Sequence, residues 1–202
     1  MFLARMPTPP QPRSANPWAL PNLLTYGRVA AVPFVVFFMM WPQNYWMRWM
    51  AFAVFAVAAV TDFFDGYLAR AWSQQSSLGR VLDPIADKLI VAASLLVLVA
   101  DRTISGWSLW AAIVILCREI LVSGLREYLA ELRVSVPVST VAKWKTTLQI
   151  LAVGFLIAGP AGEPLVPGTQ MIGLVLLWVS ALLTLYTGWD YLKAGIKHVV
   201  ED

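Results

Sequence analysis

Long apolar runs alternate with short polar segments that contain proline or glycine along most of the chain. The runs are continuous rather than alternating residue by residue, and each is near the roughly 20 residues that a helix needs to cross a bilayer. Because lipid offers no hydrogen bonds to an open strand, helices are favoured at this depth. The pattern predicts six membrane-spanning helices, near 23–41, 46–69, 83–99, 107–125, 145–158 and 171–192.

Composition supports the same class of protein. Hydrophobic residues make up 59% of the 202 positions and charged residues 13%, whereas soluble domains are roughly half apolar and a quarter charged. The composition therefore predicts an all-α, polytopic membrane protein surrounded by membrane lipids. No basic patch of the kind that binds nucleic acid is present, and the single Cys117 excludes a disulfide within the chain.

The positions of lysine and arginine predict the orientation. Only Arg48 and Arg102 fall at the ends that would lie outside, while the others lie in the N-terminal tail, the alternate loops, the C-terminus or the adjoining helix portions. By the positive-inside rule both termini are then cytoplasmic. We interpret 1–20, which is rich in proline and polar residues, as a disordered cytosolic tail, 21–193 as the transmembrane domain and 194–202 as a C-terminal tail.

Four aspartates lie at the predicted cytoplasmic ends of the second and third helices. Asp62 and Asp65 are three residues apart and Asp83 and Asp87 four apart, so each pair shares a helix face. The connection between the two helices is short, which predicts antiparallel neighbours that bring all four acids together. An alternative for Asp83 is structural, since Asp followed by Pro84 is typical of an N-cap and first helical residue.

Such a cluster predicts a metal site. Like charges oppose one another's ionisation unless cations lie among them. Carboxylates without Cys or His suit hard cations, and Mg²⁺ or Mn²⁺ is favoured where phosphate is a further ligand. Two such ions about 4 Å apart can clamp both oxygens of an in-line phosphoryl displacement.

Small and basic residues follow the first aspartate pair. Gly66 is unfavourable inside a helix, so its place after Asp65 favours close approach of a ligand, and Ala69 keeps the same side open. Arg70 offers a planar donor fork that suits a pyrophosphate. The alternatives are small-residue helix packing for Gly66 and a membrane-interface anchor for Arg70.

The segment from Asp62 to Asp87 reads D-x2-D-G-x2-A-R-x8-G-x3-D-x3-D. This pattern resembles, without departure, the signature of the CDP-alcohol phosphotransferase family of integral membrane enzymes. The segments 20–28, 118–127 and 143–147 are similar to the bacterial phosphatidylglycerophosphate synthase branch of that family. The likeness covers about 20–192 and leaves only the tails outside.

The resemblance implies transfer of the phosphatidyl group of CDP-diacylglycerol to sn-glycerol 3-phosphate, with release of CMP. It implies that Asp62, Asp65 and Asp83 bind two Mg²⁺ or Mn²⁺ ions and that Asp87 is both a ligand and the base for the acceptor hydroxyl. It also implies a homodimer in the bacterial inner membrane, with its active site facing the cytoplasm. The implied nucleotide-binding residues are Asn22, Asp62, Gly66, Ala69, Arg70, Ser76 and Gly79.

An acceptor that carries its own phosphate requires further cations at the same membrane face. Arg118 is the strongest candidate because it lies deepest in an apolar run. Each candidate has an alternative interpretation as a positive-inside charge or as the partner of a nearby glutamate. The candidates for the acceptor phosphate are Arg118, Arg126, Lys143 and Lys145, with Thr25 and Arg28 as weaker ones.

Two other functions stay open at this point. A relative within the family could use another acceptor, such as phosphatidylglycerol in a cardiolipin synthase, or a serine or inositol phosphate. A divalent-cation transporter could also place aspartates within the membrane. A transporter would more naturally carry acids in both halves of the chain, whereas here the four lie in one helix pair.

Overall fold

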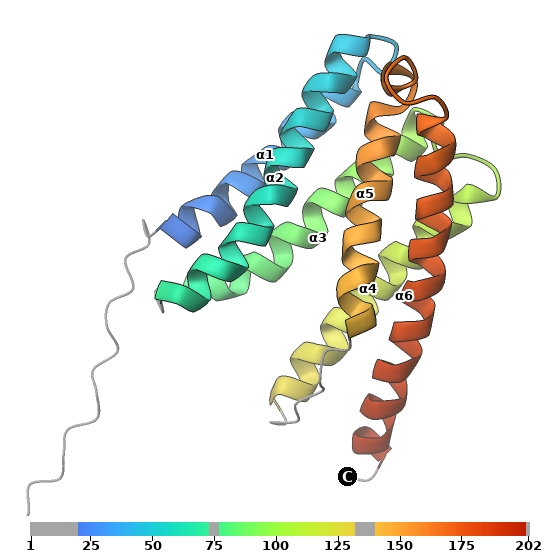
Figure 1. Ribbon diagram of the computed structural model, residues 1–202. Coiled ribbons are helices and arrows are strands. Elements are labelled where there is room, and N and C mark those ends of the chain that lie inside the picture. Colours follow the sequence, from blue (N-terminus) through green and yellow to red (C-terminus); the bar gives the residue numbers. More distant parts are fainter. Residues whose placement is uncertain (1–19, 73–76, 132–139, 201–202) are drawn as a thin grey trace, which may run out of the picture.

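The computed structural model describes the backbone of residues 20–72, 77–131 and 140–200, and over these ranges it contains six α-helices and no strand. Side chains are described for 22–62, 82–130, 144–189 and 192–193. The helices run alternately up and down, so that α1 begins and α6 ends at the same end of the bundle (Figure 1). They are α1 (Leu20–Met39), α2 (Tyr45–Trp72), α3 (Ser77–Ala100), α4 (Ser108–Glu131), α5 (Thr140–Gly162) and α6 (Thr169–Val200).

The predicted all-α class is confirmed, and each apolar run forms one helix. Most of the helices extend beyond the apolar run, because polar turns at the membrane boundary continue the same backbone hydrogen bonding. One predicted boundary is wrong: α3 begins at Ser77, so Asp83 is not an N-cap and Pro84 lies inside the helix. Proline inside a helix removes one backbone hydrogen bond and can be accommodated where neighbouring helices support the turn.

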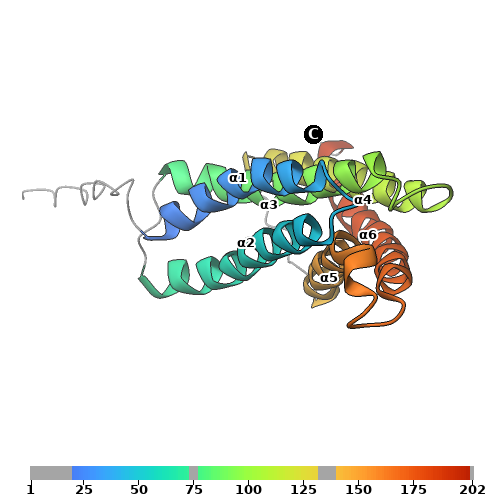
Figure 2. The ribbon, with the colours of Figure 1, turned by 90° about the horizontal axis from the view of Figure 1, so that it is seen from above.

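The helices form two layers. Viewed from above, α1, α3 and α4 lie in one row and α2, α5 and α6 in the other (Figure 2). Helix α1 packs on α2 and α3, α5 packs along α6 and against α2, and α4 packs on α6. The core between them is apolar and contains fully buried side chains from each helix of the two rows, including Val35, Phe55, Leu95, Ile115, Leu156 and Leu177.

Large apolar side chains also cover the outside of the bundle, including Trp46, Trp107, Trp110 and Trp189. Within the described residues, three segments are long and apolar enough to cross a membrane by length and composition: Asn22–Met39, Ser108–Ala130 and Thr169–Trp189. The chain is therefore a helical membrane protein, since a soluble bundle would not present so many exposed aromatic and aliphatic residues. The count of six spans and the cytoplasmic position of the termini stay predictions.

A buried ion pair ties three helices together at the short-loop end, where 40–44, 101–107 and 163–168 connect the helices. Arg48 of α2 is 3% exposed and donates to Asp101 Oδ2 at 2.6 Å and to Thr103 Oγ1 at 3.1 Å. The same guanidinium also donates to backbone carbonyls, at 2.8 to 3.3 Å, of Pro42, Ile157 and Leu156. We call this group, with Arg48 at its centre, the Arg48 cluster.

Helix α5 is kinked beside this cluster. Gly159 has φ 43° and ψ −127°, a backbone conformation that residues other than glycine rarely adopt. A Cβ atom at this position would come within 2.6 Å of Arg48 Nη1. The kink therefore needs glycine for two reasons, its backbone conformation and the close approach of the arginine.

Candidate active site

Three aspartates from two helices converge on one arginine at the opposite end of the bundle. Arg28 of α1 donates from Nη1 to Asp62 Oδ1 at 2.6 Å and to Asp87, and from Nη2 to Asp83 Oδ1 at 3.0 Å. Thr25, one turn earlier on α1, donates to Asp83 Oδ1 at 2.6 Å. We call Thr25, Arg28, Asp62, Asp83 and Asp87 the aspartate cluster.

The charges in the aspartate cluster do not balance. The guanidinium of Arg28 is 2% exposed, whereas the three carboxylates that it contacts are 30 to 45% exposed. Among the side chains that the structure describes, three partly exposed carboxylates therefore meet one buried cation. Such an arrangement attracts further cations, because unpaired carboxylates close together repel one another.

A cavity of about 320 Å³ extends from the aspartate cluster to α4 and α5. Arg28, Asp62 and Asp87 lie in its wall, and α4 and α5 supply the polar residues of the remaining wall. Those residues are Glu119, Arg126, Thr146 and Gln149, together with Lys88 of α3. Carboxylates and cations from different helices thus line one common cavity.

Two of the cations predicted to bind the acceptor phosphate, Arg118 and Lys145, lie beside Glu119. Lys145 of α5 is 3% exposed and forms an ion pair with Glu119 of α4, and Arg118 Nη1 lies 3.6 Å from the same carboxylate. Arg118 Nη2 also donates to Thr187 Oγ1 of α6 at 3.0 Å. Glu119, which lines the cavity, thus lies beside one cation of its own helix and one of α5.

A second polar cavity, of about 290 Å³, lies between α3 and α4. Arg118 lines it, and Lys88, Glu119 and Arg126 line both cavities, so the two spaces adjoin. Lys88 Nζ donates to Ser123 Oγ and so connects α3 to α4 beside Asp87. The region next to the aspartate cluster is therefore rich in cations that a phosphate could engage.

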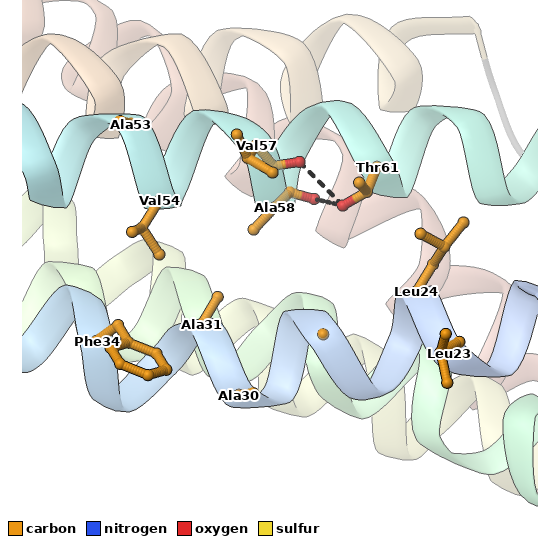
Figure 3. Close-up of a pocket in the computed structure, with 11 residues that line it drawn as sticks. Leu23, Leu24, Ala30, Ala31, Phe34, Ala53, Val54, Val57, Ala58 and Thr61 are labelled. Atoms are coloured by element: carbon orange, nitrogen blue, oxygen red, sulfur yellow. Dashed lines mark hydrogen bonds between the residues drawn. The ribbon is translucent and has the colours of Figure 1, made fainter.

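An apolar groove approaches the aspartate cluster from the side of α1 and α2 (Figure 3). It has a volume of about 410 Å³ and includes Thr61, immediately before Asp62, and Gly27, immediately before Arg28. Thr61 Oγ1 donates to the carbonyls of Val57 and Ala58 at 2.9 and 2.8 Å, so its hydroxyl is turned onto its own helix. The groove is thus apolar along its length and extends to the residues next to Asp62 and Arg28.

Several predicted site residues cannot be placed in this arrangement. Asn22 is buried on α1, 1% exposed. Five other nucleotide-site candidates, the metal-ligand candidate Asp65 and the acceptor-site candidate Lys143 lie outside the residues whose side chains the structure describes. These are Asp65, Gly66, Ala69, Arg70, Ser76, Gly79 and Lys143, and their roles stay predictions.

The donor chemistry of the aspartate cluster fits a divalent metal. Among the side chains that the structure describes, no three His, Cys, Asp or Glu residues form a ready-made metal cage. The carboxylates of Asp62, Asp83 and Asp87 nevertheless converge on one point, through Arg28, and their oxygen atoms are the hard ligands that Mg²⁺ and Mn²⁺ prefer.

The sequence did not reveal the position of Arg28, or that Lys88 and Gln149 line the cavity. The alternative interpretation of Arg118 and Lys145 as partners of a nearby glutamate is confirmed, since both lie beside Glu119. Arg28 was a weak candidate for the acceptor phosphate, whereas in the structure it lies among the carboxylates. One signal could have indicated this, because an arginine flanked by apolar residues in a membrane helix requires buried partners. The same reasoning applies to Lys88, which directly follows Asp87 in a membrane helix.

Comparison with known proteins defines the class. Residues 18–186 match the family model described as CDP-alcohol phosphatidyltransferase. The match covers most of the chain and includes the aspartate cluster and the cations around Glu119. The chain belongs to the CDP-alcohol phosphatidyltransferase family, and the resemblance indicated by the sequence is confirmed.

Individual relatives share one printed name, CDP-diacylglycerol–glycerol-3-phosphate 3-phosphatidyltransferase. The protein of Rickettsia bellii is 42% identical over 181 residues, which cover 89% of this chain and 96% of the relative. That of Cereibacter sphaeroides is 35% identical over 218 residues, with coverage of 92% and 99%. That of Pectobacterium atrosepticum is 42% identical over 184 residues, with coverage of 90% and 97%. The similarity therefore extends over nearly the whole of each protein.

Proposed function

We propose that this protein transfers the phosphatidyl group of CDP-diacylglycerol to sn-glycerol 3-phosphate, forming phosphatidylglycerophosphate and CMP. The observation that carries this proposal is the cavity that Asp62 and Asp87 share with Lys88 of α3 and Arg126 of α4, next to the ion pair of Glu119 with Lys145. The printed names of relatives at 35–42% identity support the same reaction. The proposed product is a precursor in phospholipid biosynthesis.

The reaction requires one bond to form and one to break at phosphorus. The acceptor's hydroxyl oxygen attacks the phosphorus atom that carries diacylglycerol, and the bond from that phosphorus to the CMP oxygen breaks. Asp87 takes the hydroxyl proton, and CMP leaves with the electron pair. An ordinary carboxylate is a weak base, so most of the acceleration must come from positioning and from stabilisation of charge.

Two Mg²⁺ or Mn²⁺ ions would be held by Asp62, Asp65, Asp83 and Asp87. When bound, they would neutralise the pyrophosphate and stabilise the departing CMP. Arg28 keeps the three described carboxylates close together, because it donates to each of them from the side of α1. The remaining nucleotide contacts would come from Asn22, Gly66, Ala69, Arg70, Ser76 and Gly79.

The acceptor phosphate would bind among Arg118, Arg126, Lys143 and Lys145. Glu119 pairs with Lys145 and lies near Arg118, so it keeps these side chains in place beside the cavity. A phosphate that enters would share the two cations with Glu119, and charge-assisted hydrogen bonds from arginine suit its oxygen atoms. Thr25 and Arg28 donate hydrogen bonds to the carboxylates, so these contacts argue against their predicted role in binding the acceptor phosphate.

The apolar groove between α1 and α2 suits an acyl chain of the lipid substrate, because it is lined almost entirely by apolar side chains and extends to Thr61, the residue before Asp62 (Figure 3). A lipid held there would present its pyrophosphate to the aspartate cluster. We further propose that the protein is a homodimer of the bacterial inner membrane, with the transmembrane domain at 21–193 and the active site facing the cytoplasm.

The direct test is release of CMP by purified protein in detergent or lipid, with CDP-diacylglycerol and a series of acceptors. CMP release with sn-glycerol 3-phosphate, and incorporation of labelled glycerol 3-phosphate into lipid, is the expected result. Release with phosphatidylglycerol but not with glycerol 3-phosphate would instead indicate a cardiolipin synthase. Metal-dependent ion flux through proteoliposomes without CDP-diacylglycerol would favour a transporter.

A further inference from the structure

A buried amide oxygen, Oε1 of Gln149 in the wall of the active-site cavity, lacks a hydrogen-bond donor among the described residues. Gln149 of α5 is 4% exposed, and within the described part of the chain no group donates a hydrogen bond to its Oε1 atom. The same side chain lines the cavity that contains Asp62 and Asp87. Buried polar atoms are nearly always paired, so an unpaired amide oxygen beside a cavity indicates that a ligand supplies the donor.

The position of Gln149 relative to the predicted phosphate site indicates which ligand could donate a hydrogen bond to its amide oxygen. Lys145 and Gln149 are four residues apart on α5 and therefore lie on one helix face, about 6 Å apart along the axis. Thr146, three residues before Gln149, also lines the cavity. A small molecule whose phosphate is held near Lys145 would extend along this face, past Thr146, toward Gln149.

The depth of Gln149 agrees with that of the reacting groups. Gln149 lies nine residues after the start of α5, Asp87 lies ten after the start of α3, and Asp62 lies ten before the end of α2. These helix ends are at the same end of the bundle because neighbouring helices are antiparallel (Figure 1). The acceptor's hydroxyl groups would thus meet Asp87 of α3 and Gln149 of α5 in one cavity.

We propose that Gln149 accepts a hydrogen bond from the hydroxyl of the acceptor that does not react, and so selects a vicinal diol phosphate over a mono-alcohol phosphate. The proposal rests on the proposed function and adds a specificity residue to it. A neutral amide suits this task, since it does not add negative charge beside the aspartates and does not take the proton of the attacking hydroxyl. Removal of the hydroxyl from the acceptor, or of the amide from the protein, should then have the same effect.

The test pairs two acceptors with two proteins. Wild-type protein should use sn-glycerol 3-phosphate about tenfold better in kcat/KM than 3-hydroxypropyl phosphate, which lacks only the central hydroxyl. Gln149→Met should use both acceptors about equally, by losing rate with glycerol 3-phosphate while keeping its rate with 3-hydroxypropyl phosphate. Gln170→Met, at the short-loop end on α6, is the matched control and should keep the preference.

Each result decides the proposal. A Gln149→Met protein that keeps the tenfold preference, or that loses rate equally with both acceptors, overturns it. If Gln149→Met does not fold, Gln149→Asn withdraws the amide by one methylene and should reduce the preference; an unchanged preference in that variant also overturns the proposal. Wild-type protein that releases no CMP with either acceptor refutes the proposed function itself, which is a separate outcome.

Discussion

The aspartate cluster and the Arg48 cluster are built from the same types of residue but differ in their charge balance. In the Arg48 cluster one arginine meets one aspartate, and each guanidinium nitrogen donates to an oxygen atom. In the aspartate cluster one arginine meets three aspartates. Asp101 is also closed off, with its side chain 3% exposed, whereas Asp87 is 45% exposed beside a cavity.

The difference separates a structural ion pair from the proposed active site within one membrane bundle. Where charges balance and all donors are satisfied, removal of a partner leaves a buried charge and should destabilise the fold. Where carboxylates exceed cations and face a cavity, the fold has accepted repulsion that a bound cation can relieve. Loss of one such carboxylate should impair activity far more than stability.

The largest expected effect is that of Asp87→Asn. An amide cannot take the proton of the acceptor hydroxyl, so the rate of CMP release should fall by roughly 10²- to 10⁴-fold. Nucleotide binding should weaken much less, and the thermal midpoint should stay the same or rise. The rate is measured by CMP release and binding by titration with CDP-diacylglycerol; near-normal turnover would exclude Asp87 as the base.

Arg48→Met should reduce the stability of the protein and leave its activity unchanged. It leaves Asp101 buried without its partner and should reduce the free energy of unfolding by about 3–5 kcal/mol. Activity per folded molecule should be retained. Unfolding in detergent provides the measurement, and the double variant Arg48→Met/Asp101→Leu should recover part of the loss because it removes both charges. Equal stability of the single variant and the wild type would contradict a structural role.

Arg118→Ala tests the cation side of the cavity. The KM for glycerol 3-phosphate should rise about tenfold or more, while the KM for CDP-diacylglycerol changes little, because the arginine is proposed to contact the acceptor phosphate. Steady-state kinetics with each substrate varied in turn separates the two effects. A similar change in both KM values would show that Arg118 mainly supports α6 through Thr187.

The smallest expected effect is that of Gly159→Ala. The positive φ of Gly159 and the approach of Arg48 Nη1 should together destabilise this variant by about 1–3 kcal/mol. Gly124→Ala on α4 is the matched control, since a Cβ there meets no atom within 4 Å and the position is helical. The control should be neutral or stabilised, by up to about 1 kcal/mol. Equal thermal midpoints for both variants would contradict strain at the kink.

The sequence predicted those features that depend on local pattern. Continuous apolar runs located all six helices, because the period and length of a run determine how a chain meets lipid. The spacing of Asp83 and Asp87 placed both on one face of α3. The family resemblance added the reaction, which local pattern alone does not specify.

The remaining features depend on contacts between helices that are distant in sequence. Arg28 reaches Asp62 and Asp87 from another helix, and nothing near Arg28 in the sequence indicates those partners. The buried position of Gln149 likewise depends on how α5 faces α3. The predicted start of α3 was wrong because Asp83 and Pro84 form a favourable helix start in sequence, whereas the helix already begins at Ser77.

The most direct test of the excess carboxylates is the metal dependence of CMP release. Purified protein is treated with a chelator, dialysed, and assayed with CDP-diacylglycerol and sn-glycerol 3-phosphate while Mg²⁺ or Mn²⁺ is added back. We predict no release after chelation and full recovery on addition of the metal, with Asp101→Asn showing the same metal dependence as wild type. Release of CMP that depends on glycerol 3-phosphate yet persists without divalent metal would contradict the account.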